Sequence, residues 1–134
     1  SREKSAARMQ TTSDYFSNLT NHQFISLTTY RKTGAAVATP VWFALDGNRL
    51  VMTTDGTSGK VKRIRNNSRV EVAPSDMRGK VLGEAVAAQA RILQGNAATA
   101  AEKLLKKKYG LQWTMFGAAT RNNGRIYLEI TPKQ

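Results

Sequence analysis

TPVWFALDGNRLVMTTDGTSGKVKRIRNN, residues 39–67, contains the clearest signals of secondary structure in this sequence. Two runs of β-forming residues, 41–45 and 50–54, flank Asp46-Gly47-Asn48, a tripeptide typical of a tight hairpin turn. A polar segment then leads to Ser58, a good N-cap for a helix over residues 59–66. The stretch therefore predicts two antiparallel strands followed at once by a short helix.

The predicted helix is strongly basic, because it carries Lys60, Lys62, Arg63 and Arg65. The first turn of a helix presents unpaired backbone N–H groups and the positive end of the helix dipole, so it favours anions. Lys60 lies in that first turn, and Arg63, three residues further on, shares its face. We expect this helix start to bind an anion, in particular a phosphorylated cofactor. The alternative is a solvated helix whose arginines favour the negative end of the dipole.

Three hydroxyl side chains, those of Thr53, Thr54 and Ser58, come just before the helix. They can donate hydrogen bonds to phosphate oxygens, and we expect a ligand role for one of the two threonines. The alternative is that the threonines are ordinary strand residues and that Ser58 only caps the helix.

On the N-terminal side of this stretch, two sets of side chains alternate along residues 23–30, which predicts a strand. Residues 31–34 form a turn in which Gly34 is free to adopt positive φ. Residues 35–43 form the returning strand. Pro40 removes one donor from that strand, so we expect a sheet edge or a β-bulge there.

The remaining elements are short and separated by turns. We expect a short helix carrying Tyr15, Phe16 and Leu19 and capped by Thr12 or Ser13, and no element is assigned to residues 111–117. The other expected elements are strands over residues 69–74, 81–93 and 124–131, and a helix over residues 97–109 that Asn96 caps and Gly110 ends. About six short strands predict a mainly β fold with short helices, arranged as an antiparallel barrel.

Composition narrows the classes of function. The chain has 134 residues, no cysteine and one histidine, His22, so it contains no disulfide, no thiolate metal site and no histidine cluster. No apolar run approaches a membrane span, and no signal-peptide pattern is present, so we expect a cytoplasmic protein with no membrane partner.

The formal net charge is +12. Residues 1–8 resemble an expression-tag remnant, which leaves residues 9–134 as a single domain beginning at Met9. Those eight residues hold three basic and one acidic side chain, so the rest of the chain keeps a charge of +10. Such a charge favours an anionic partner.

Five segments and a C-terminal KKYG (residues 107–110) together resemble the pyridoxamine-phosphate-oxidase-like split β-barrel superfamily. The branch they resemble most is that of small proteins dependent on the deazaflavin coenzyme F-420. The segments are FISLTTYRKTG (24–34), TPVWF (39–43), GNRLVMTT (47–54), SGKVKRIRNN (58–67) and RVEVAP (69–74).

The resemblance implies a six-stranded split β-barrel of the FMN-binding-protein type, assembled as a homodimer with a cofactor in each of two grooves between subunits. It places the 39–43 strand along the flavin or deazaflavin ring, Thr53 and Thr54 near the ribityl phosphate, and Lys60 on the phosphate. A bulge at Pro40 would aim the backbone of Val41 and Trp42 toward that ring, although an aromatic in a barrel strand is equally expected in the core.

This sequence departs from the family pattern at one position that matters for cofactor choice. In the pyridoxamine-phosphate oxidases an arginine precedes the phosphate-binding lysine, whereas here Gly59 does. The chain also lacks the C-terminal substrate-binding segment of those oxidases, so we do not expect vitamin B6 oxidation.

Two classes of function follow. The first is an oxidoreductase that transfers a hydride between reduced F-420 and a small organic acceptor, with FMN as the alternative cofactor; no catalytic residue and no metal ligand is assigned. The second is a non-enzymatic flavin carrier of the same fold. Nucleic-acid binding is disfavoured because the aromatic residues fall mostly in strand patterns and are not interleaved with basic ones.

Overall fold

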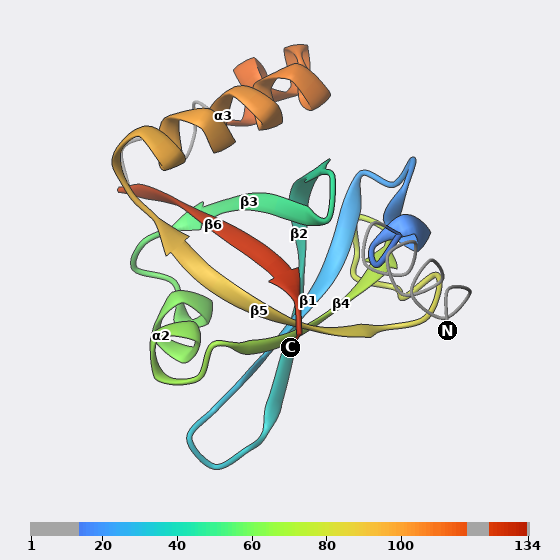
Figure 1. The fold of residues 1–134 in the computed structure, drawn as a ribbon, viewed down its shortest axis with the longest axis vertical. Coiled ribbons are helices and arrows are strands. Elements are labelled where there is room, and N and C mark those ends of the chain that lie inside the picture. Colours follow the sequence, from blue (N-terminus) through green and yellow to red (C-terminus); the bar gives the residue numbers. More distant parts are fainter. Residues whose placement is uncertain (1–13, 118–123, 134) are drawn as a thin grey trace, which may run out of the picture.

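Six antiparallel strands form a closed barrel in the order β1-β2-β3-β6-β5-β4 (Figure 1). The computed structural model describes residues 14–117 and 124–133. The barrel confirms the mainly β, split-barrel fold that the sequence predicts. The elements are η1 (Ser17–Leu19), β1 (Phe24–Tyr30), β2 (Ala36–Asp46), β3 (Arg49–Asp55), α2 (Gly59–Asn66), β4 (Arg69–Ser75), β5 (Val86–Leu93), α3 (Gly95–Tyr109), the π-helical segment η2 (Trp113–Gly117) and β6 (Arg125–Pro132).

Residues 39–67 form the hairpin and the helix that their sequence predicts. Asp46 pairs with Arg49, so the β2–β3 hairpin closes over Gly47 and Asn48, with Gly47 at a φ of 64°. Helix α2 covers the predicted residues. Ser58 occupies the N-cap position, but its side chain makes no capping hydrogen bond.

Pro40 lies at a sheet edge and not in a bulge. The pairing of β1 with β2 runs without interruption through Ser26 and Pro40, so the expectation of a bulge is wrong. Strand β3 pairs with β2 only from Phe43 onward. The missing N–H of Pro40 therefore costs the ladder nothing, because β3 does not pair with β2 at that point.

The barrel interior is the main hydrophobic core, and α2 covers one end of it. Alternate residues of every strand point inward, among them Leu27, Phe43, Met52 and Leu128, each with no exposed surface. Ile64 of α2 joins this core, while Val61 is also fully buried. Burial of these two residues fixes the orientation of α2, and so directs its other face outward.

Helix α3 lies above β3 and β6 in Figure 1, and a second core of buried side chains forms between it and the outer face of the barrel. Ala101, Leu105 and Tyr109 of α3 are buried against Val51 and Tyr127. The apolar stripe of this helix is therefore covered by its own barrel, and it does not supply free surface for a second subunit.

Three sequence-based boundaries need correction. The strand expected from residue 81 begins at Val86, and Val81 forms only an isolated bridge with Ser75. The helix expected from residue 97 begins at Gly95, with Gln94 in the N-cap position. The expected N-terminal helix is reduced to the 3-10 turn η1. The tag remnant and the caps Thr12 and Ser13 lie outside the described residues.

Lys108 and Tyr109 join the end of α3 to β1 and β2. The Tyr109 hydroxyl accepts a hydrogen bond from the Phe43 backbone N–H (2.9 Å) and lies 2.6 Å from the carbonyl oxygen of Gln23. The Lys108 Nζ donates to the carbonyls of His22 (2.8 Å) and Phe43 (2.7 Å). Burial lowers the pKa of Lys108 to about 8. Lys108 thus connects α3 to the backbone before β1 and to β2.

We expect Tyr109→Phe to lower the free energy of unfolding by about 1–3 kcal/mol, because the substitution leaves the buried Phe43 N–H without its acceptor. Urea denaturation would measure the loss. Tyr30→Phe is the matched control: it removes one hydroxyl that donates to Glu71 at a less buried position. Equal losses in the two variants would contradict the role given to Tyr109.

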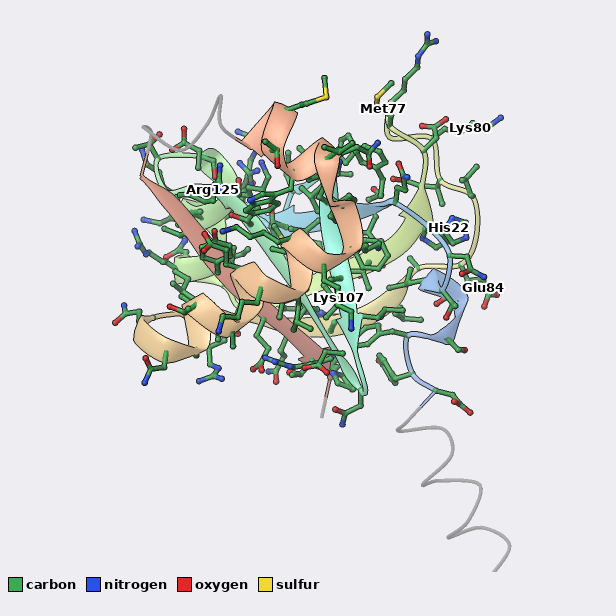
Figure 2. The ribbon with its side chains drawn as sticks, turned by 90° about the horizontal axis from the view of Figure 1, so that it is seen from above. His22, Met77, Lys80, Glu84, Lys107 and Arg125 are labelled. Atoms are coloured by element: carbon green, nitrogen blue, oxygen red, sulfur yellow. The ribbon has the colours of Figure 1, made fainter. Side chains whose placement is uncertain are left out.

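No helix among the described residues is long and apolar enough to cross a membrane. Large apolar side chains are exposed in two regions outside the cores. Met77, Val81 and Leu82 lie on the connection between β4 and β5, and Leu111 and Met115 follow α3. Figure 2 shows Met77 projecting at the edge of the molecule, well apart from Arg125.

Candidate cofactor-binding site

The loop between β3 and α2 is held in place by local hydrogen bonds. The Asp55 carboxylate accepts hydrogen bonds from the backbone N–H (2.8 Å) and hydroxyl (2.7 Å) of Thr57, and these bonds lower the pKa of Asp55. The Gly56 N–H donates to the carbonyl of Gly124, and a Cβ at Gly56 would lie 2.8 Å from that oxygen. The loop therefore fixes where α2 begins.

Lys60 lies half-buried in the first turn of α2. Burial lowers the pKa of its amine, and the nearby charge of Arg63 lowers it further, while Asp55 acts in the opposite direction. An anion next to Lys60 would offset both unfavourable effects. This position thus favours the anion-binding interpretation over a solvated lysine.

Arg63 covers Gly59. Its Nη1 lies 2.7 Å from the point where a Cβ of residue 59 would be. Its Nε donates to the Thr29 hydroxyl at 2.6 Å, and Thr29 is buried. The guanidinium is therefore fixed beside the start of α2, in space that a side chain at position 59 would take. At the position where this sequence departs from the family pattern, the Arg63 guanidinium thus takes the space beside Gly59.

Ser58 supplies an unpaired hydroxyl at the same place. Its Oγ is buried and has no hydrogen-bond partner among the described residues. Buried hydroxyls in proteins are normally paired, so an unpaired one next to a helix N-terminus fits a bound oxyanion. We call Ser58, Lys60, Arg63 and the first N–H groups of α2 the α2 anion site.

Thr53 and Thr54 point to opposite faces of β3, because successive strand residues alternate. The Thr53 hydroxyl donates to the carbonyl of Ile126 at 2.8 Å, so it has no proton left for a ligand. Thr54 lies on the same side of β3 as Met52. Of the two, Thr54 remains the candidate donor.

The side chains of Val41 and Trp42 are both used in packing. Val41 is 8% exposed and lies in the barrel core. Trp42 stacks on Tyr109, with ring centroids 4.3 Å apart and planes 6° apart. Pro40 is exposed. A contact between this strand and a cofactor ring therefore has to use Pro40 and the backbone more than these two side chains.

The structure also reveals a cleft that sequence analysis missed. It has a volume of about 690 Å³ and lies between α2 and the β1–β2 turn, which extends below the barrel beside α2 in Figure 1. We call it the basic cleft. Its lining residues are Tyr30, Arg31, Lys32, Thr33, Gly59, Lys62, Arg63, Arg65 and Asn66. The only sequence signal was the Arg31-Lys32 pair in a turn, which is ordinary for a surface loop.

The closed six-stranded barrel defines the class of protein, a pyridoxamine-phosphate-oxidase-like split barrel. The family model described as pyridoxamine 5'-phosphate oxidase matches residues 12–134, and the chain belongs to that family. No protein among the curated ones matches it.

Several solved structures share the fold at low sequence identity. An FAD-binding protein of Mesorhizobium loti is 14% identical, with 88% of this chain and 86% of that chain covered and a TM-score of 0.67. An F420 reductase is 18% identical, with coverage of 88% and 92% and a TM-score of 0.58. The heme storage protein HutZ of Vibrio cholerae is 8% identical, with coverage of 90% and 89% and a TM-score of 0.66. Since the names of these proteins give them different ligands, the fold does not decide the ligand here.

Proposed function

We propose that this protein binds an anionic flavin-type cofactor, with the cofactor phosphate at the α2 anion site. The observation that carries the proposal is the unpaired Ser58 hydroxyl beside Lys60 and the fixed Arg63. Neither cation forms an ion pair with a carboxylate in the described part of the chain. Membership of the pyridoxamine 5'-phosphate oxidase family and the FAD and F420 proteins of the same fold support a flavin-type ligand.

The proposed activity is hydride transfer between reduced coenzyme F-420 and a small organic acceptor. The bound cofactor supplies the hydride chemistry. The protein supplies position and charge: Lys60 and Arg63 oppose the phosphate charge, and the Ser58 hydroxyl donates to a phosphate oxygen. The Thr29 contact keeps Arg63 in place, so little ordering is required when the ligand binds.

Charge favours F-420 over FMN. F-420 carries a phosphodiester and an oligoglutamate tail, so it bears more negative charge over a greater length than FMN. The chain has a net charge of +12, and five cationic side chains line the cleft next to the α2 anion site. An FMN-dependent oxidoreductase and a flavin carrier without catalysis are the alternatives within the same proposal.

Fluorescence titration of the full chain with F-420 and with FMN tests this choice. We expect tighter binding of F-420, and a steeper loss of its affinity as salt rises, because more charge is screened. Equal or weaker binding of F-420 would favour the FMN alternative. Oxidation of the bound, reduced cofactor by electron-poor alkenes would then separate an enzyme from a carrier.

We also propose that the protein is a homodimer, as the family resemblance implies. The exposed Met77, Val81 and Leu82, each more than half exposed, provide the apolar surface that a second subunit would cover. Light scattering that shows a monomer able to bind cofactor would contradict this assembly.

A further inference from the structure

The basic cleft collects positive charge without compensation. Five of its lining side chains are cationic and none is acidic. Elsewhere in the described part of the chain, Arg49 and Arg91 pair with Glu129, and Lys106 pairs with Glu102. None of the cleft cations has such an ion pair among the described residues.

The Glu71 carboxylate, next to the cleft wall, already accepts a hydrogen bond from the protein. Glu71 accepts a hydrogen bond from the Tyr30 hydroxyl, and Tyr30 lines the cleft. Like charges gathered around one cleft repel one another and destabilise the unliganded protein. A bound anion would relieve this repulsion.

The cleft continues from the α2 anion site. Gly59, Lys62, Arg63 and Asn66 follow the i, i+3, i+4, i+7 spacing, so they form one face of α2, turned away from the buried Val61. Gly59 and Arg63 belong to both the cleft and the α2 anion site. From Gly59 to Asn66 this face extends about 10 Å at 1.5 Å per residue, which is longer than one phosphate group.

We propose that the basic cleft is a second oxyanion site, which binds a further phosphate or carboxylate group beyond the one at the α2 anion site. The source of this second phosphate or carboxylate group rests on the proposed function: the group belongs to a bound cofactor that is longer and more acidic than FMN. A separate small polyanion has the same chemistry, and the experiment distinguishes the two sources.

The test compares two double variants of the full chain. Lys62→Ala/Arg65→Ala removes two cleft charges and leaves Ser58, Lys60 and Arg63 in place. Lys103→Ala/Lys107→Ala removes two charges from the exposed face of α3, where Figure 2 shows Lys107. Each variant is titrated with F-420, with FMN and with inorganic tripolyphosphate, and its unfolding is followed in urea.

We expect the cleft variant to bind F-420 about 10-fold more weakly than wild type, and FMN less than about threefold more weakly, with unchanged or higher stability when unliganded. The α3 variant keeps wild-type affinity for both. Tripolyphosphate that displaces F-420 at a clearly lower concentration than it displaces FMN shows that the cleft holds part of the cofactor, whereas tripolyphosphate bound beside F-420 assigns the cleft to a separate polyanion.

Equal weakening of F-420 and FMN, or an equal effect of the α3 variant, would overturn the second site. If wild type binds neither flavin-type ligand, the proposed function fails on its own. In that case tripolyphosphate binding that the cleft variant loses still supports the oxyanion site, and an absence of tripolyphosphate binding overturns it.

Discussion

Lys60→Ala is expected to weaken the binding of FMN or F-420 by roughly 10- to 150-fold. The substitution removes one charge-assisted contact with the phosphate, worth about 1.5–3 kcal/mol. Lys60 is half-buried beside Arg63, and its lowered pKa shows that the charged amine is disfavoured without a ligand. Titration by fluorescence at constant salt gives both affinities.

Stability provides the control for Lys60→Ala. Since burial and Arg63 already disfavour the Lys60 charge, we expect the unliganded variant to be as stable as wild type or slightly more stable. Arg65→Ala removes the same charge further along α2, and should weaken FMN binding clearly less. Equal FMN binding by the two variants, or a loss of unliganded stability as large as the loss of FMN binding energy, would contradict the role of Lys60.

Arg63→Ala should weaken FMN binding by roughly 10- to 100-fold, and Gly59→Arg added to it should restore most of the loss. The reason is steric: the Arg63 guanidinium fills the space that a side chain at position 59 would use. With Arg63 removed, an arginine at position 59 has room, and it recreates the order seen in the pyridoxamine-phosphate oxidases. The same titration measures the single and the double variant.

Thr29→Val is the matched control for Arg63. It removes the acceptor of the Arg63 Nε, but it keeps the guanidinium charge and nearly the same side-chain volume. We expect it to weaken FMN binding less than Arg63→Ala does. If Gly59→Arg/Arg63→Ala is folded by urea unfolding but binds FMN no better than Arg63→Ala alone, then an arginine at position 59 cannot replace Arg63.

Local signals in the sequence predicted the elements around the site. Asp46-Gly47-Asn48 between two β-rich runs specified the β2–β3 hairpin, and Ser58 with the basic run after it specified α2. Such patterns involve residues close in sequence, so they can be recognised from one sequence without knowledge of the tertiary contacts. The prediction that a strand begins at residue 81 is wrong. Val81 and Leu82 continue the apolar pattern of the strand in the sequence, but in the structure Val81 forms only an isolated bridge with Ser75.

The geometry of the site depends on contacts between distant residues and was not predictable in this way. Arg63 bonds to Thr29, 34 residues away, and Tyr109 bonds to Phe43, 66 residues away. The stacking of Trp42 on Tyr109 likewise requires α3 to cross β2. The sequence therefore named Lys60, Arg63 and Ser58 as candidates, but it could not show that Arg63 lies over Gly59, or that α2 and a distant turn line the basic cleft.

The contribution of the phosphate group to cofactor binding tests the α2 anion site most directly. Titrate the wild-type chain with FMN and riboflavin, and with F-420 and its phosphate-free deazaflavin counterpart, each pair differing in the phosphate-bearing part. We predict that the phosphorylated member of at least one pair binds 10-fold tighter or more, corresponding to about 1.4 kcal/mol, and that Lys60→Ala/Arg63→Ala abolishes the difference. Equal affinities within both pairs, or a difference that survives in the double variant, would contradict an anion site at the start of α2.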